Sequence, residues 1–341
     1  MKKFLSLLLF ALTTIVLAAC SGDTDSSNDS TEKTNKLNIY TTVYPLQYFT
    51  ERIGADFVNV KSIYPAGSNE HTFEPTQRAM IDLADSDLFF YIGLGLEGFV
   101  DKAKTTLKEE NVKFVETAEN VSEEDLHIST GHTHAEAIKE DDHNHDDDDH
   151  EHDEEGHGEE HHEDHQHSDH DSHVWLSPVI SKQLAAVIKD ELIKAMPEQE
   201  QLFTQNYNVL VQELDTLHRD FLSMSEKVSN KTFFVSHAAF GYIAGHYGLN
   251  QVPVAGLNSQ SEPSQKQLAA IVDLARKEKI THIFFEQNVS SNLTKVIQEE
   301  IGAEASVLHN LSVLTEKDIK NKEDYFTLMR ANLDVLENAL K

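Results

Sequence analysis

The chain has 341 residues, which is long enough for two lobes that each bury a core of their own. Its formal net charge of −31 argues strongly against a nucleic-acid-binding protein, because phosphate binding needs a basic face, and it suits a protein that attracts cations. The chain contains a single cysteine, which excludes internal disulfide bonds.

The N-terminus has the pattern of an export signal. A basic pair precedes an apolar run from Phe4 to Leu17, which is too short to span a bilayer comfortably. Small residues then lead to Cys20, an arrangement that resembles a bacterial lipobox, in which the cysteine is lipidated and becomes the first residue of the mature protein. We therefore expect residues 1–19 to be a signal peptide and the mature protein to be held by acyl chains at the extracytoplasmic face of the cell membrane.

Residues 20–36 contain the lipidated cysteine and a polar stretch without apolar periodicity, which predicts a flexible leash. Residues 37–197 then alternate between strand and helix patterns, which predicts a first α/β lobe with parallel pairing. Ser177 and Pro178 give the cap and first position of its last helix. The expected strands are 37–43, 57–63, 87–92 and 112–115, and the expected helices are 45–53, 76–85, 96–107 and 178–195.

An insertion at 127–170 interrupts this lobe. It consists mainly of His, Asp and Glu and holds thirteen of the 20 histidines. Because the insertion contains few apolar residues, it cannot bury a core, and we expect a disordered, solvated segment. Imidazoles among carboxylates suit divalent cations, and the absence of cysteine and of a fixed ligand spacing predicts weak, multivalent zinc capture rather than a preformed cage. The alternative is a polar spacer, for which acidic residues alone would suffice.

Residues 198–228 contain neither Gly nor Pro and have apolar residues at helical spacing, including Leu210, Leu214 and Leu217. This pattern predicts one long helix that joins the lobes. Residues 229–341 repeat the strand and helix alternation and predict a second α/β lobe. Its expected strands are 232–236, 251–255, 281–285 and 306–308, and its expected helices are 240–247, 264–279, 292–301 and 323–340.

Candidate ligands follow the predicted strands, where open α/β sheets bind small ligands. His71 lies in the loop after the second strand, and His173 opens the ordered segment after the insertion. His237 and Glu286 end two strands of the second lobe. Three imidazoles and one carboxylate suit four-coordinate Zn²⁺, so we expect one tight zinc site between the lobes. The other histidines of the two lobes are read as structural or surface residues, namely His218, His246, His282 and His309.

Four segments around these residues resemble the metal-site motifs of the zinc and manganese solute-binding lipoproteins of ABC importers. They are YPAGSNEHTFEPT (64–76), DSHVWLSP (171–178), SHAAFGY (236–242) and IFFE (283–286). The match covers nearly all of the chain after the leash, and the acidic His-rich insertion resembles the zinc branch in particular. The resemblance implies two α/β lobes joined by one rigid helix, with a metal held between them and handed to a membrane permease. We expect a monomer.

By this resemblance, His71, His173 and His237 match the three His ligands of the family, and Glu286 matches the carboxylate used in zinc importers of this kind. Glu70, beside His71, is the reserve carboxylate. Two departures stand out: Asp-Ser-His at 171–173 replaces the frequent Asp-Pro-His, and Asn310 stands where manganese relatives offer an Asp. Because an amide is a poorer ligand for a hard cation, Asn310 favours zinc.

The expected function is extracytoplasmic capture of Zn²⁺ and its delivery to an ABC permease. One alternative is a manganese-delivering protein, and another is a surface metal buffer or adhesin without transport, which would share the site and lack the permease. A zinc hydrolase would keep one ligand position open for water and need a base, for which Glu74 is the candidate. Glu74 precedes Pro75 in a loop, and no HExxH motif is present, so we expect a binding protein and not an enzyme.

Overall fold

The computed structural model describes residues 36–131, 170–259, 263–287 and 291–341. The predicted signal peptide, the lipidated Cys20, the leash as far as residue 35 and positions 132–169 of the insertion lie outside the described residues. The described residues between Lys36 and Lys341 belong to one compact unit.

The first lobe is built on a four-stranded parallel sheet in the order β2-β1-β3-β4. The inner strand β3 is the run Leu-Phe-Phe-Tyr, and all four of its residues are buried, as expected for a parallel strand covered on both faces. The strands are β1 (Leu37–Thr41), β2 (Val58–Ser62), β3 (Leu88–Tyr91) and β4 (Lys113–Glu116), and the lobe's helices are α2 (Tyr44–Gly54), α3 (Gln77–Ala84), α4 (Val100–Thr106), α5 (Glu123–Leu126) and α7 (Pro178–Ala195).

The second lobe has the same strand permutation, β6-β5-β7-β8, and its three pairings are also parallel. Both sheets therefore gather the carboxyl ends of their strands at one edge, where ligands bind in open α/β sheets. The strands are β5 (Thr232–His237), β6 (Asn250–Ala255), β7 (His282–Phe285) and β8 (Glu304–Val307), and the helices are α9 (Gly241–His246), α10 (Gln265–Lys277), α11 (Asn292–Ile301), α12 (Glu316–Asn321) and α13 (Tyr325–Ala339).

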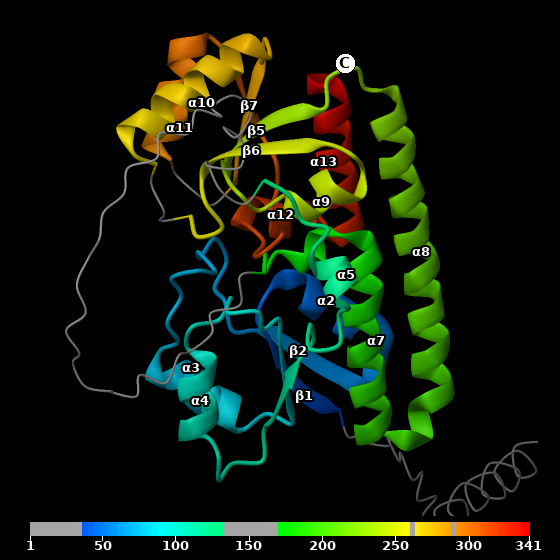
Figure 1. The fold of residues 1–341 in the computed structure, drawn as a ribbon. Helices are drawn as coiled ribbons and strands as arrows, with labels where there is room; N and C mark the ends of the chain where they lie inside the picture. The colour runs from blue at the N-terminus through cyan, green and yellow to red at the C-terminus, as the bar shows by residue number, and fades with distance from the viewer. Residues whose placement is uncertain (1–35, 132–169, 260–262, 288–290) are drawn as a thin grey trace, which may run out of the picture. The chain divides into compact units, whose positions relative to one another are not determined.

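The long helix α8 (Glu200–Lys227) follows a short 3-10 turn at Pro197–Gln199. It packs against α7 and α2 of the first lobe and against α13 of the second (Figure 1). Its buried side chains recur at helical spacing, with Leu210, Leu214, Leu217 and Phe221 on one face. The expected fold class, two α/β lobes with parallel sheets and a long helix between them, is confirmed.

Some helices and strands differ from those expected from the sequence. The helix expected from residue 96 begins at Val100, because Gly93, Leu94 and Gly95 all have positive φ and form a turn. The last strand of the second sheet begins at Glu304 rather than Ser306. Helices α5 and α12 were not predicted, because four and six residues are too few to show a period. In the part of the chain that the structure describes, no helix is long and apolar enough to cross a bilayer.

Candidate metal centre

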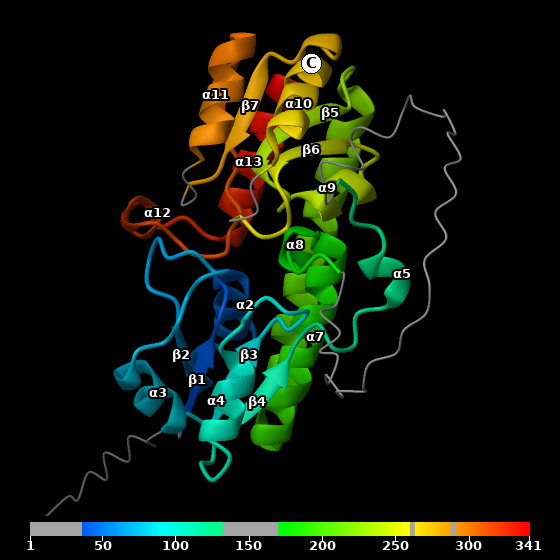
Figure 2. The same ribbon diagram turned by 60° about the vertical axis from the view of Figure 1, so that its left-hand side comes forward.

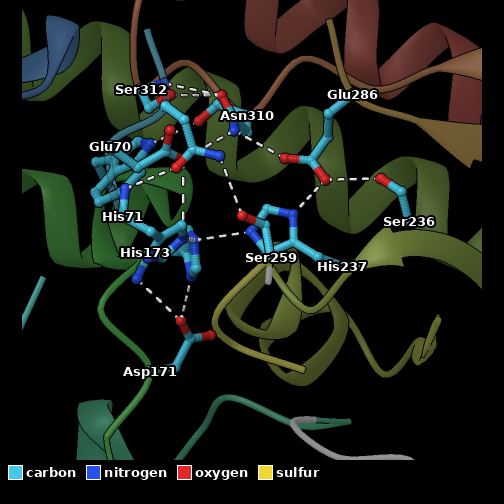
Figure 3. A network of polar contacts seen from close by, with 12 residues as sticks. Glu70, His71, Asp171, His173, Ser236, His237, Ser259, Glu286, Asn310 and Ser312 are labelled. Carbon is cyan, nitrogen blue, oxygen red and sulfur yellow. Dashed lines mark hydrogen bonds and ion pairs between the residues drawn. The ribbon is translucent and has the colours of Figure 1, made fainter. Parts of the chain in front are cut away.

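Three of the four predicted ligands converge on one point. His71 lies in the loop after β2, His173 immediately precedes the short 3-10 turn Val174–Leu176, and His237 is the last residue of β5. His173 Nε2 lies 3.3 Å from His71 Nε2 and 3.2 Å from His237 Nε2 (Figure 3). Zinc–nitrogen bonds of about 2.0–2.1 Å at a tetrahedral angle would place two ligand atoms about 3.4 Å apart. The rings are thus spaced as ligands of one ion.

The carboxylate beside the three rings belongs to Glu70. Its Oε1 lies 4.0 Å from His71 Nε2, and one donor atom from each of these four residues lies within 4.8 Å of the others. Glu70 is buried, and its Oε2 has no hydrogen-bond partner among the described residues.

Glu286, the fourth ligand expected from the sequence, does not belong to this four-residue cluster. It accepts hydrogen bonds from His237 Nδ1, from Ser236 Oγ at 2.9 Å and from Asn310 Nδ2 at 2.8 Å. The reason is that β5 and β7 are neighbours, so a carboxylate that follows β7 meets the outer nitrogen of the ring that ends β5. Glu286 therefore contacts His237 from behind, on the side away from the other two rings (Figure 3).

Carboxylates fix the tautomers of two rings. Asp171 Oδ1 accepts from His173 Nδ1 at 2.7 Å and from the His173 backbone N–H at 2.9 Å. Glu286 does the same for His237 Nδ1. With the proton on Nδ1, each Nε2 directs its lone pair toward the centre, which is the arrangement that orients metal-ligating histidines in proteins.

Burial and charge set the protonation of the site. Burial, reinforced by the neighbouring His173 and His237, lowers the pKa of His71 to about 2, so this ring is neutral. Burial opposes charge on both His237 and Glu286, but their mutual attraction prevails, which raises the pKa of His237 and lowers that of Glu286. A metal cation bound by His237 would therefore have to displace a proton from this ring.

Other side chains support the three rings and the two carboxylates, and these contacts are not evident from the sequence alone. Asn310 Nδ2 donates to Glu70 Oε1 at 3.0 Å as well as to Glu286, so one amide positions both carboxylates. Ser129 Oγ donates to Asp171 Oδ2 at 2.5 Å. Trp175 is buried and packs on His173 with ring centroids 5.3 Å apart. Asp171 and Ser236 lie beside predicted ligands, in the segments 171–178 and 236–242 singled out above. The contacts of Ser129 and Asn310 are evident only from the tertiary structure.

The remaining histidines of the two lobes lie apart from this cluster. Three of them have local partners: His218 Nδ1 is 3.2 Å from Tyr247 Oη, His282 Nδ1 is 2.9 Å from Thr281 Oγ1, and His309 Nε2 is 3.1 Å from Asp318 Oδ2. Glu74, considered as a catalytic base, is exposed and does not belong to the four-residue cluster.

Comparison with known proteins agrees with this geometry. Residues 39–339 match the family model described as "Zinc-uptake complex component A periplasmic" (ZnuA). The chain is 35% identical over 337 residues to the zinc-binding lipoprotein AdcA of Streptococcus pneumoniae, a match that covers 99% of this chain and 61% of that protein. It is 31% identical over 339 residues to the high-affinity zinc uptake system protein ZnuA of Bacillus subtilis, covering 99% and 98%.

Among solved structures, the Zn(II)-bound ZnuA-like domain of Streptococcus pneumoniae AdcA matches with a TM-score of 0.68 and 30% identity, over 89% of this chain and 99% of that domain. The chain thus spans only part of the longer streptococcal protein but all of the domain that resembles ZnuA. Because the family model extends over residues 39–339, the chain belongs to the ZnuA family of zinc-uptake components.

Proposed function

We propose that this protein captures Zn²⁺ outside the cytoplasm and delivers it to an ABC permease. The observation that carries the proposal is the set of three imidazole Nε2 atoms spaced 3.2–3.3 Å along the cluster, two of them turned inward by carboxylates. Lone pairs that converge at this distance repel one another unless a cation lies between them. Three nitrogen donors and one carboxylate are a donor set typical of zinc.

We assign Glu70 as the fourth ligand, with His71, His173 and His237, and we assign Glu286 to the support of His237. A buried polar atom without a partner costs about 1–3 kcal/mol, and more when it is charged. Glu70 Oε2 is such an atom among the described residues, and a metal bond would satisfy it. Both oxygens of Glu286 already accept hydrogen bonds.

The proposed shell favours binding over catalysis. Four protein ligands close a tetrahedral site, whereas a hydrolytic zinc centre keeps one position for water and places a base beside it. Manganese is disfavoured for two reasons. Imidazole nitrogens suit zinc better, and the Asn310 oxygen already accepts from Gln287 Nε2 at 2.8 Å and from the Ser312 backbone N–H at 3.1 Å.

Attachment to the membrane and the permease partner complete the proposal. The leader at 1–19 and the lipobox-like Cys20 support export and lipid anchoring, with 20–36 as the leash. The relatives named above are a zinc-binding lipoprotein and a zinc uptake protein, which supports delivery rather than storage. We assign 37–197 and 229–341 to the two lobes and 198–228 to the helix that links them.

A comparison of two carboxylate variants tests the ligand assignment. We expect Glu70→Gln to lose the tight zinc equivalent in a competition titration against a chelating dye, because a ligand is removed. Glu286→Gln keeps the four ligands and should weaken the equivalent without abolishing it. Glu74→Gln, an exposed change in the same loop as Glu70, is the control. Unchanged affinity in Glu70→Gln together with loss in Glu286→Gln would reverse the assignment.

Delivery is tested in cells that lack their own zinc-binding component. The wild-type chain should restore growth in zinc-depleted medium, and Cys20→Ala should impair this restoration while leaving zinc affinity of the purified protein intact. Equal restoration by Cys20→Ala would refute the need for the lipid anchor.

A further inference from the structure

A second cluster of metal-binding side chains lies on the surface, at the base of the insertion. Glu123 opens α5, His127 follows that helix, and His170 is the last residue of the insertion and the first described residue after position 169. Glu123 Oε2 lies 3.6 Å from His127 Nε2 and 3.3 Å from His170 Nε2. The two rings face each other edge to face, with centroids 5.1 Å apart.

These distances suit one shared ion. One donor atom from each residue lies within 4.8 Å of the other two, and the two nitrogen–oxygen distances bracket the value of about 3.4 Å expected along an edge of a tetrahedral zinc site. An ion pair with Glu123 would need only one histidine and contributes little at a surface. Two imidazoles around one carboxylate oxygen instead form a chelating set for a divalent transition metal.

The local sequence explains why Glu123 and His127 meet. They are four residues apart across one helical turn, which places both side chains on the same face. Ser122 caps the turn by accepting a hydrogen bond from the Asp125 backbone N–H at 3.1 Å. His170 comes from the other end of the insertion, so an ion here would join the two ends of that segment.

Residues 128–130, which follow His127, are hydrogen-bonded to and packed against the second lobe. The Thr130 backbone N–H donates to Gly241 O at 3.2 Å, and Gln251 Nε2 donates to Thr130 O at 3.2 Å. Figure 2 shows the chain after α5 running up to α9 and β6 of the second lobe. A Cβ added to Gly245 would lie 1.7 Å from Ile128 O, so only glycine permits this approach. The residues that follow His127 therefore have a fixed path.

The same region supports the cleft. Asp171 directly follows His170, and its two oxygens accept hydrogen bonds from Ser129, near the start of the insertion, and from His173, which lies after it. Tyr242 Oη also donates to the Asp171 carbonyl oxygen at 2.7 Å. The surface cluster is thus separated from a cleft ligand by a short, hydrogen-bonded stretch of chain.

We propose that Glu123, His127 and His170 form a second, solvent-exposed zinc site at the base of the insertion, weaker than the cleft, which holds zinc between the insertion and the cleft. The intermediate role rests on the proposed zinc delivery, whereas the existence of the site does not. The site leaves a coordination position for water or an incoming ligand, which allows rapid exchange.

The test uses the full chain with the eleven histidines of 132–169 replaced by glutamine, so that length is kept and the other imidazoles of the insertion are removed. Zinc titration of this variant should show two equivalents, one tight and one weaker. Adding His127→Gln and His170→Gln should remove the weaker equivalent and keep the tight one. His282→Gln is the matched control, because His282 Nε2 lies 3.6 Å from Glu304 Oε2 in a surface pair that contains one histidine.

A weaker equivalent that persists without His127 and His170, or that disappears equally in His282→Gln, would overturn the proposal. So would a single equivalent in the starting variant. If the double change also disturbs the tight equivalent, Glu123→Gln decides, since it leaves 170–173 untouched and should still remove the weaker one. A crystal soaked in zinc should show anomalous density between the three side chains. In cells, a variant that lacks the weaker equivalent but keeps the tight one should deliver less zinc if the surface site has the intermediate role. Full delivery by that variant would refute the intermediate role but not the existence of the site.

Discussion

The cleft and the surface cluster use the same ligand types in different surroundings. In the cleft, the side chains of His173 and His237 are fully buried, and a carboxylate holds the outer nitrogen of each ring. At the surface, the side chains of Glu123 and His127 are 75% and 72% exposed. Exposed side chains must be ordered when the metal binds, which costs conformational free energy, whereas the cleft rings are already held in place. In our two proposals, burial and outer-shell hydrogen bonds, rather than ligand identity, would therefore make the cleft site tight and the surface site weak.

The largest expected effect is the loss of a cleft ligand. His237→Ala should weaken the tight zinc equivalent by more than about 100-fold, because a missing ligand costs more than a missing outer-shell partner, which costs about 10–100-fold. Competition with a chelator measures the change, with His218→Gln as control. The weaker surface equivalent should remain, and its loss in His237→Ala would contradict the independence of the two sites.

A second experiment tests how burial alone changes the pKa of a carboxylate that has no histidine partner. Burial raises the pKa of Glu97 to about 7, although the backbone N–H groups of Ile92 and Gly93 and the hydroxyl of Thr42 donate to it. Asp171 and Glu286, equally buried, have lowered pKa values because each faces a histidine.

The folded state therefore keeps the Glu97 proton at pH values where the unfolded chain, with a carboxyl pKa of about 4.5, has lost it. The stabilisation is complete below about pH 4.5 and is lost as pH rises through about 7. At about 1.4 kcal/mol per pKa unit, this amounts to about 3 kcal/mol. Urea unfolding of the zinc-free protein should show a free energy of unfolding that falls between about pH 4.5 and pH 7, and Glu97→Gln should lose this pH dependence. An unchanged pH dependence in Glu97→Gln would contradict the raised pKa.

Removing the outer-shell carboxylate of His173 should have an intermediate effect. Asp171→Asn should weaken the tight equivalent by about 10–100-fold, since the amide no longer favours the tautomer with the proton on Nδ1. Asp190→Asn, which changes an exposed aspartate paired with Lys189 on α7, is the control. Wild-type affinity in Asp171→Asn would show that the ring is oriented by packing on Trp175 instead.

The smallest effect concerns the surface site. Ser122→Ala removes the cap of α5, and a cap contributes about 1 kcal/mol, so the weaker equivalent should lose about fivefold in affinity. Ser291→Ala, which removes the corresponding cap of α11, should change neither equivalent. A change in the tight equivalent alone would mean that α5 supports the cleft rather than the surface site.

Much of the fold was predictable, because buried parallel strands and amphipathic helices leave strong patterns. The expected helix at 178–195 and the helix at 292–301 have the bounds that the structure gives. His71, His173 and His237 could be selected because they follow strands or border the insertion. The choice between Glu70 and Glu286 could not be made in this way, since it depends on whether a side chain points at an ion or at the back of a neighbouring ring. Asn310 was read as a poor ligand, and only the structure shows it donating to both carboxylates.

The anchoring of the insertion at both ends has a geometric consequence. Gly131, whose φ of +72° allows its carbonyl to accept from Gln251 Nε2 at 3.2 Å, and His170 beside Asp171 fix where the segment leaves and re-enters the protein. The midpoint of residues 132–169 is about 19 residues from either end, so at about 3.6 Å per residue no histidine there can lie farther than about 70 Å from an anchor. Zinc captured by these histidines, as the sequence predicts, would therefore be at a raised local concentration relative to the cleft of the same molecule.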